Sequence, residues 1–193
     1  MITDILVFRT LGNVSIRTAT IAHKDDYIAH ELSDRLTESL FEEAKKKGID
    51  VREIIWDERY KSDCIMFEIS ENDSGKTIGF CEINHILSEE PTIGIKLAAE
   101  YRGKGYGFLA AKMMIEEGWK IFDHPYFVWE LEQENTASRK LILKLGGRLI
   151  DSRCALSESM IQVLRENGIE FDSKELPNSI ERYAIERPRA SQQ

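Results

Sequence analysis

Apolar and polar residues alternate along several short segments of the chain, a period of two that is typical of strands with one buried face. The segment 126–131, YFVWEL, is instead almost continuously aromatic and apolar, which indicates a parallel strand that is buried on both faces. A turn rich in Asn, Asp, Ser and Gly at 72–75 predicts a hairpin between the strands on either side of it. In chain order, the predicted strands are 14–18, 64–70, 76–85, 92–97, 126–131, 148–151 and 181–187.

Apolar residues that recur every three or four positions predict amphipathic helices between these strands. The segment 24–47 begins with acidic residues and ends with three lysines before Gly48, as the helix dipole favours. One helix, or two helices divided at Ser33 and Asp34, would fit this segment. Its apolar ladder consists of Ile28, Leu32, Leu36 and Leu40. Other helices are predicted at about 108–120, directly after Asn135, and at about 157–167.

The length of 193 residues predicts one domain, 1–193, because a chain of this size can bury a single substantial core. We expect the core of this domain at about 14–187 and a frayed tail at 188–193. A long segment separates the last two predicted strands. We therefore expect 152–180 to be a helical insertion before the final strand.

Three glycines alternate with larger residues in the segment 102–107, RGKGYG, between the 92–97 strand and the helix that follows. Glycines lack the Cβ atoms that would keep a ligand off the backbone, so several main-chain N–H groups can converge on one anion. The start of the next helix adds unpaired N–H groups and the positive end of its dipole. Arg102 and Lys104 add full charges, so this segment is a candidate site for phosphate or diphosphate.

Three phosphate-loop patterns can be compared with this segment. A dinucleotide-binding fingerprint that starts at Gly103 needs a sixth-position glycine, and that position is Phe108. A P-loop needs Gly-Lys-Ser/Thr after a glycine and four spacer residues, and the sequence contains no such run. The pattern Arg/Gln-x-x-Gly-x-Gly/Ala does fit, through Arg102, Gly105 and Gly107. A glycine-rich turn without a ligand is the alternative interpretation.

A second motif follows the 126–131 strand. Asn135 can cap a short helix, Ser138 lies three residues further on, and Gly146 and Gly147 end that helix. The two motifs, in this order, resemble those of the GNAT N-acetyltransferases, although Gly147 stands where the family often has phenylalanine. The chain is most similar to the branch that acetylates protein α-amines, including those of ribosomal proteins. The resemblance implies an α/β (α+β) fold with a mixed, mostly antiparallel central sheet flanked by helices.

The resemblance also implies a binding mode for acetyl-CoA, between two neighbouring parallel strands that splay apart. The diphosphate would lie on the main-chain amides of 103–107, and the pantetheine arm would pair with the end of the 92–97 strand like an added strand. Asn135 would contact the same arm. The implied cofactor-binding residues are Ile95, Leu97, Ala98, Arg102, Gly103, Lys104, Gly105, Tyr106, Gly107 and Asn135.

In the reaction of this family, a neutral amine attacks the thioester directly. The ammonium must first lose a proton, and the departing thiolate benefits from gaining one. The candidate bases are Glu82 and Glu130, with His85 third, and an exposed or ion-paired structural role competes with catalysis for each. Many family members place a tyrosine acid where this chain has Ile142, so Ser138 is the candidate to face the sulfur.

Composition narrows the range of partners. The net charge of −8, from 26 basic and 34 acidic residues, argues against binding to nucleic-acid phosphates and weakly favours a cationic acceptor. No apolar run is long enough to span a bilayer and the N-terminus lacks a secretory layout, so we expect a cytoplasmic protein with no membrane partner. Neither the histidines nor the three cysteines, Cys64, Cys81 and Cys154, have the spacing of metal ligands. We therefore expect no metal.

The expected function is therefore transfer of an acetyl group from acetyl-CoA to a primary amine, on a small molecule or at a peptide or protein N-terminus. Two alternatives stay open. The first is a non-catalytic binder of coenzyme A or acyl-CoA that acts as a sensor or interaction module, and the second is transfer of a longer acyl group. Homodimers are common in families of this kind, so a homodimer is the assembly to test.

Overall fold

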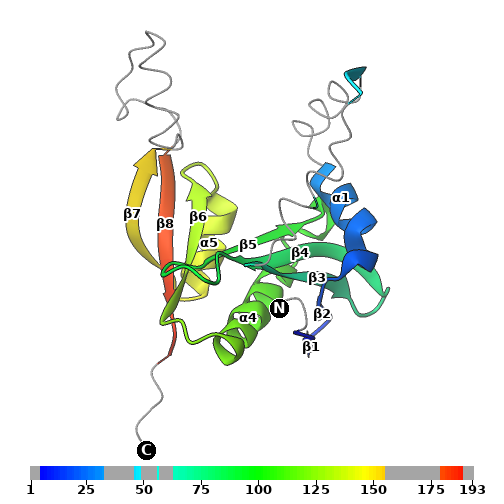
Figure 1. Cartoon of the computed structure of the whole chain (residues 1–193), viewed down its shortest axis with the longest axis horizontal. Coiled ribbons are helices and arrows are strands. Elements are labelled where there is room, and N and C mark those ends of the chain that lie inside the picture. The colour runs from blue at the N-terminus through cyan, green and yellow to red at the C-terminus, as the bar shows by residue number, and fades with distance from the viewer. Residues whose placement is uncertain (1–4, 33–45, 49–55, 57–62, 155–178, 189–193) are drawn as a thin grey trace, which may run out of the picture. The chain divides into compact units, whose positions relative to one another are not determined.

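The computed structural model describes residues 5–32, 46–48, 56, 63–154 and 179–188. It has the helices and strands of an α/β protein whose strand pairs are mostly antiparallel, as predicted (Figure 1). The chain divides into two compact units, Met1–His124 and Pro125–Gln193. The single domain stays a prediction, and so does the parallel pairing of 92–97 with 126–131, because these strands belong to different units.

The described residues of unit 1 contain five antiparallel strands in the order β1-β2-β3-β4-β5. They are β1 Phe8–Leu11, β2 Val14–Thr18, β3 Ile65–Glu71, β4 Lys76–Asn84 and β5 Thr92–Leu97. Strands β2 to β5 and the hairpin at 72–75 confirm the sequence prediction. The sequence pattern does not predict β1, because its side chains oppose the usual rule: Phe8 is 73% exposed while Arg9 is half-buried.

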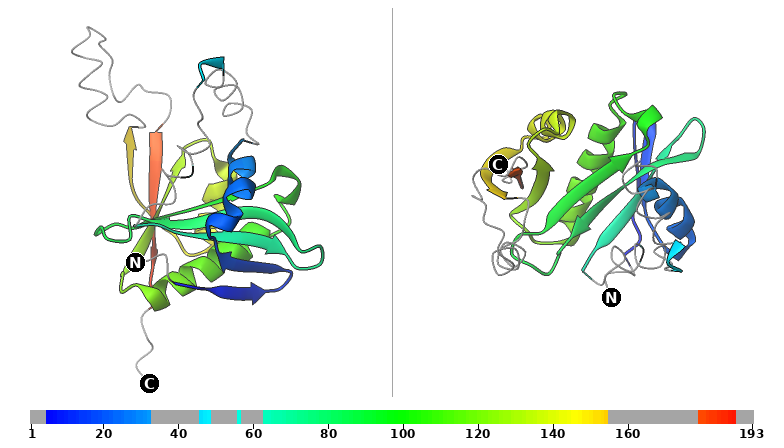
Figure 2. Two further views of the ribbon diagram at one scale, coloured as in Figure 1. Left: turned by 45° about the vertical axis from the view of Figure 1, so that its right-hand side comes forward. Right: turned by 90° about the horizontal axis from the view of Figure 1, so that it is seen from above.

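Two helices cover opposite faces of this sheet (Figure 1, Figure 2). On one face, α4, Tyr106–Ile121, packs against β1, β2, β4 and β5. On the other face α1, Lys24–Leu32, packs against β4, where the ring centroids of Tyr27 and Phe80 lie 5.2 Å apart. Trp56 is buried in the same cluster. The buried residues of α4 are Ala110, Ala111, Met113, Met114, Ile115 and Gly118.

Strands β4 and β5 approach each other closely at Gly79. A Cβ atom on this residue would lie 2.2 Å from the carbonyl oxygen of Lys96 and 2.7 Å from Leu97 Cδ2. Such separations lie far inside van der Waals contact, so only glycine fits here without moving β5. Position 79 therefore determines how closely the end of β5 can lie against β4.

Among the described residues of unit 1, one carboxylate is buried. Glu68 on β3 is 1% exposed, and it accepts hydrogen bonds from Arg17 Nε of β2 and from Thr77 Oγ1 of β4. His23 Nε2, from the 3-10 helix η2 (Ile21–His23), lies 3.5 Å from Glu68 Oε2. Burial by itself raises the pKa of Glu68, but the bonds from Arg17 and Thr77 and the nearby charges together outweigh it and lower the pKa. Glu68 therefore stays ionised at neutral pH.

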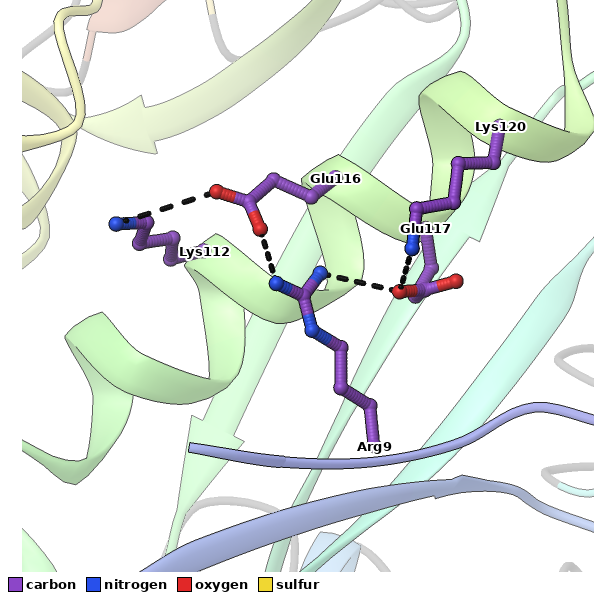
Figure 3. Close-up of polar contacts among 5 residues, drawn as sticks. All are labelled: Arg9, Lys112, Glu116, Glu117 and Lys120. Atoms are coloured by element: carbon purple, nitrogen blue, oxygen red, sulfur yellow. Dashed lines mark hydrogen bonds and ion pairs between the residues drawn. The ribbon is translucent and has the colours of Figure 1, made fainter. Parts of the chain in front are cut away.

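A charged cluster attaches β1 to α4 (Figure 3). Arg9 donates one hydrogen bond to Glu116 and another, 3.0 Å long, to Glu117 Oε1. Lys120 Nζ lies 2.7 Å from Glu117 Oε1, and Lys112 Nζ lies 4.0 Å from Glu116 Oε1. Each glutamate thus has cations on two sides, and the guanidinium of Arg9 is shared by both.

Replacing Arg9 with alanine is expected to lower the free energy of unfolding by about 1 kcal/mol, because two partly buried glutamates lose their shared guanidinium. Urea unfolding measures the change. Arg9→Lys keeps the charge but not the two-pronged geometry, so it should recover only part of the loss. If Arg9→Ala unfolds at the wild-type urea concentration, the cluster contributes nothing to the attachment of β1.

Unit 2 contains a three-stranded antiparallel sheet in the order β6-β8-β7, and α5, Thr136–Lys144, packs against β6. The strands are β6 Tyr126–Glu132, β7 Arg148–Cys154 and β8 Ser179–Glu186. They confirm the three predicted strands, but β7 runs past the predicted end at 151. The pairing of β7 with β8 has a register shift between Leu149 and Asp151.

Three sequence predictions fall largely outside the described residues. These are the choice between one helix and two in 24–47, the helix at 157–167 and the tail at 188–193. The predicted insertion, 152–180, is shorter at both ends than expected, because its first residues belong to β7 and its last to β8. The remainder of that insertion lies outside the described residues as well.

The end of α5 is closed by Gly146 and Gly147. Gly146 has a φ of 85°, and the N–H of Gly147 donates to the carbonyl of Ile142 at 2.9 Å. Ile142 is fully buried, whereas Leu141 and Leu145 are half-buried. A Cβ atom on Gly147 would lie 2.3 Å from Ile142 Cγ2. The two departures from the family motif, at 142 and 147, are therefore parts of one packing arrangement.

Gly147→Ala is expected to lower the free energy of unfolding by about 1–3 kcal/mol, because the new methyl group would overlap Ile142 Cγ2. Urea unfolding of a double-mutant cycle with Ile142→Ala tests the cause. In the Ile142→Ala background, where Cγ2 is gone, Gly147→Ala should cost less than it does alone. Equal costs in the two backgrounds would contradict the packing explanation.

Candidate functional site

The glycine segment lies between two helical elements of unit 1. The 3-10 helix η3, Ala99–Tyr101, follows β5, and α4 begins at Tyr106 with Gly105 as its N-cap. The φ angles of Gly103 and Gly105 are 75° and 84°, in the left-handed region that glycine adopts at little cost. The predicted helix start at about 108 was therefore wrong by one half-turn, because a left-handed glycine cap leaves no trace in the apolar periodicity.

Five consecutive N–H groups in this segment are open to a ligand. Within the part of the chain that the structure describes, none of the amides of 103–107 donates a hydrogen bond. Backbone hydrogen bonds flank the segment, from Arg102 N to Ala99 O at 3.2 Å and from Phe108 N to Gly105 O at 3.1 Å. A Cβ atom on Gly103 or Gly105 would meet no atom within 4 Å, so the space beside the segment is open as well. This arrangement suits an anion.

Two cations accompany these amides. The Nε of Arg102 donates to the carbonyl of Leu97 at 2.9 Å, which holds the guanidinium at the end of β5. Lys104 Nζ lies 5.1 Å from the centroid of the Tyr101 ring, at the distance of a cation–π contact. Both side chains are exposed, so they can approach a bound anion. The predicted charges are therefore present beside the open amides.

The main chain at the end of β5 is partly used within unit 1. The N–H of Ala98 donates to the carbonyl of Ile78 at 3.0 Å, and the carbonyl of Leu97 accepts the bond from Arg102. The carbonyl of Ala98 also accepts a hydrogen bond, from the N–H of Tyr101 at 3.0 Å. The predicted contacts of Ile95, Leu97 and Ala98 with the arm stay predictions.

The second motif lies in unit 2. Asn135 caps α5, as predicted, because its Oδ1 accepts a hydrogen bond from the N–H of Ser138 at 3.0 Å. The Asn135 side chain is exposed and Ser138 is half-exposed, so both can face a ligand. Ile142, at the position of the family tyrosine, is fully buried and has no proton to donate. The cofactor contact of Asn135 and the role of Ser138 stay predictions.

Glu130, one of the two candidate bases, is held by two arginines. Arg153 donates through one nitrogen to both carboxylate oxygens of Glu130, at 2.7 Å and 2.8 Å. Arg182 Nε donates to Oε1 of the same carboxylate at 3.2 Å. An incoming ammonium group would have to compete with two guanidinium groups for these oxygens, which favours a structural role for Glu130.

Glu82, the other candidate base, lies on β4 in unit 1. Its side chain is half-exposed and lies over Gly94 of β5, where a Cβ atom would be 3.6 Å from Glu82 Oε1. His85, the third candidate, is exposed, and its Nδ1 lies 3.4 Å from Asp63 Oδ2. Glu82 and the glycine segment therefore belong to the same unit, whereas Glu130 belongs to the unit that carries Asn135 and α5.

Sequence reasoning missed a polar cluster that holds the start of α5. Arg139 donates to Glu181 Oε2 at 2.9 Å and to the carbonyl of Gln133, and the hydroxyl of Tyr183 donates to the same carboxylate oxygen at 3.0 Å. The bond from Arg139 lowers the pKa of Glu181, while burial raises the pKa of Tyr183. Arg139 lies near the N-terminus of α5, where a positive charge is unfavourable for the helix dipole. That position is a sequence signal for a carboxylate partner, but it does not identify Glu181 as the partner.

Two other kinds of feature are absent from the described part of the chain. Among the described residues, no three His, Cys, Asp or Glu side chains gather as a set of metal ligands. In the described ranges there is likewise no helix that is both long and apolar enough to cross a bilayer.

Three solved structures with a similar fold are acetyltransferases. A chimera of the spermidine N-acetyltransferase SpeG from Vibrio cholerae with hSSAT is 13% identical, with a TM-score of 0.61 over 91% of this chain and 96% of that one. RimL, a ribosomal-protein alpha-N-acetyltransferase, is 14% identical, with a TM-score of 0.59 over 93% and 98%. A GNAT-family acetyltransferase from Bacillus anthracis is 18% identical, with a TM-score of 0.63 over 93% and 98%.

Sequence comparison gives a more direct result. No curated protein matches the chain. A family model described as the acetyltransferase (GNAT) domain, however, matches residues 13–148, well over half of the chain. The matched span includes the open amides of 103–107 as well as Asn135 and Ser138. The chain therefore belongs to the GNAT family of acetyltransferases.

Proposed function

We propose that this chain transfers the acetyl group of acetyl-CoA to a primary amine, by direct attack in a ternary complex. A bond forms between the amine nitrogen and the acetyl carbon, the carbon–sulfur bond breaks, and coenzyme A leaves as a thiol. One observation carries the proposal: the five N–H groups of 103–107, which donate to no described residue and lie at the positive end of α4. With Arg102 and Lys104 they suit the diphosphate of coenzyme A.

Two side chains are proposed to handle the protons. We assign the base to Glu82, because its side chain is half-exposed and it belongs to the same unit as the glycine segment. Glu82 would take the proton of the substrate ammonium, directly or through one water, before the nitrogen attacks. The hydroxyl of Ser138 would face the departing sulfur, since Ile142 is buried and has no proton to give.

The proposed acceptor is a primary amine on a small molecule or at a protein N-terminus. The structures of similar fold include a spermidine acetyltransferase and a ribosomal-protein acetyltransferase, so both kinds of amine occur among them. The net charge of −8 favours a cationic acceptor over an anionic one. A cytoplasmic location and a homodimer complete the proposal.

Calorimetry with coenzyme A and a thiol-release assay test this function. Coenzyme A should bind the wild-type protein, and acetyl-CoA should release thiol with at least one member of a panel of polyamines, small amines and peptides with free N-termini. Glu82→Gln should lower kcat by about 100-fold or more without weakening coenzyme A binding, because it removes the base alone. Glu130→Gln is the matched control and should leave kcat near the wild-type value. Failure of the wild-type protein to bind coenzyme A would overturn the proposal.

A non-catalytic binder of coenzyme A is the second candidate. The buried Ile142 in place of the family tyrosine and the ion-paired Glu130 both favour it. The same two measurements separate it from the enzyme. Binding of coenzyme A without thiol release above the rate of hydrolysis, for every amine in the panel, would establish the binder.

A further inference from the structure

Tyr106 links the open amides to a distant part of unit 1. It is the first residue of α4, so its own N–H is one of the five at 103–107. Its hydroxyl donates to Glu71 Oε1 at 2.8 Å. Glu71 is the last residue of β3 and lies 35 positions earlier in the chain. The side chain of Tyr106 therefore connects the start of α4 to the end of β3.

Glu71 is itself held in place on its other side. Its Oε2 accepts a hydrogen bond from Ser74 Oγ at 2.8 Å, and its carbonyl accepts one from the N–H of Gly75 at 2.8 Å. Both donors belong to the turn between β3 and β4. The carboxylate thus bridges this turn and α4, with one oxygen bonded to each.

Hydrogen bonds also connect the β3–β4 turn to the turn between β1 and β2. Asn13 Nδ2 donates to Asp73 Oδ2 at 2.8 Å, and Asn72 Nδ2 donates to the carbonyl of Gly12 at 3.2 Å. Ser15 Oγ donates to Asn72 Oδ1 at 2.6 Å. The two turns form a hydrogen-bonded base on which Glu71 is fixed.

Besides the bond from Arg102 to Leu97 and the contact of Lys104 with Tyr101, few side-chain contacts order the glycine segment. A Cβ atom at 103 or 105 would contact nothing, so no packing restrains these positions from the side. Fixing a free backbone residue costs roughly 1–2 kcal/mol of conformational entropy, and a ligand that ordered the segment would bear that cost. The hydrogen bond from Tyr106 to Glu71 orders this end of the glycine segment before the ligand binds.

We infer that Glu71 is a positioning residue for the diphosphate site and acts through the hydroxyl of Tyr106. The inference rests on the proposed function, since it concerns the same amides. The charge of Glu71 works against it: Lys104 lies close enough to lower the pKa of Glu71, after the larger effects of Ser74 and Tyr106. A carboxylate near an anion site repels the ligand. Glu71 therefore supports the site through the hydrogen bond that it accepts from Tyr106, and not through its charge.

Calorimetric affinities for coenzyme A separate these two effects. Tyr106→Phe removes this hydrogen bond alone and should weaken binding about five-fold, the worth of one hydrogen bond. Glu71→Ala removes the hydrogen bond and the repelling charge together, so it should weaken binding less than Tyr106→Phe does. Glu71→Gln keeps an oxygen that accepts from Tyr106 but removes the charge, so it should bind as tightly as the wild-type protein or more tightly. Tyr101→Phe is the matched control, since among the described residues none bonds the Tyr101 hydroxyl, and it should bind like the wild-type protein.

Kinetic measurements distinguish a positioning role from a purely structural one. If Tyr106 positions the diphosphate site, kcat of Tyr106→Phe at saturating acetyl-CoA should equal that of the wild-type protein while KM for acetyl-CoA rises. Wild-type affinity in both Tyr106→Phe and Glu71→Ala would overturn the inference alone, and so would an equal loss in Tyr101→Phe. Absence of coenzyme A binding by the wild-type protein would instead overturn the proposed function, and the inference with it.

Discussion

The double variant Arg102→Glu, Gly105→Glu is expected to lose coenzyme A binding in calorimetry. The change replaces the guanidinium at the end of β5 with a carboxylate and adds a second carboxylate beside the open amides. A side chain at 105 would point into the space in which no atom lies within 4 Å, which is the space that a diphosphate would fill. Repulsion between like charges at short range and loss of the charge-assisted bonds act in the same direction, so we expect at least a roughly 100-fold loss.

Folding of this variant can be checked independently. A non-glycine residue at the φ of 84° of Gly105 costs about 1–2 kcal/mol, which a folded domain can lose without unfolding. Lys112→Glu, a charge reversal on the exposed side of the same helix, is the matched control and should bind coenzyme A like the wild-type protein. Wild-type affinity in the double variant would remove the glycine segment from the site.

Replacing the buried Glu68 with glutamine is expected to destabilise the protein by about 2–3 kcal/mol at neutral pH. The substitution keeps the size of the side chain but removes the charge that Arg17 Nε and Thr77 Oγ1 are bonded to. Arg17 is 52% exposed and remains hydrated, which limits the loss. Urea unfolding measures it, and the exposed Glu89→Gln provides a control that should change stability by less than about 0.5 kcal/mol.

The pH dependence of this difference has a definite sign. The pKa of Glu68 is lowered in the folded state from its ordinary value of 4.5, so the unfolded chain binds its proton first as pH falls. The stabilisation is fully present above that ordinary value and is lost as pH falls through the folded-state pKa. Glu68 faces Arg17 and His23, and Asp26 of α1 acts on Arg17. A gap between wild type and Glu68→Gln that widened on acidification would contradict this assignment.

Local pattern predicts most of the regular structure, and the exceptions have physical causes. The pattern of apolar and polar residues identifies β2 to β5. It fails for β1 because Arg9 takes the inward position, where it bonds two glutamates of α4, while Phe8 faces solvent. It also gives no sign that Glu68 is buried, because a buried carboxylate is stable only with partners that come from other strands.

In the candidate site as well, features that depend on neighbouring residues could be predicted, and contacts between residues far apart in the sequence could not. The spacing of the glycines predicts the open amides, since that property depends on residues next to one another in the chain. The ties that hold the site could not be predicted in this way. Tyr106 and Glu71 are 35 positions apart, and Arg139 and Glu181 are 42 positions apart, so only the folded chain brings them together.

Gly79 has a consequence for how mutational data on this protein would be interpreted. It lies on β4 and is not itself proposed to contact a ligand, yet any side chain there would press on the carbonyl of Lys96 and on Leu97, and would displace the strand that leads into the glycine segment. A saturation screen scored on turnover would rank position 79 beside 103 and 105, as intolerant of every substitution. A parallel screen scored on protein abundance would tell the crowded position from the ligand-facing ones.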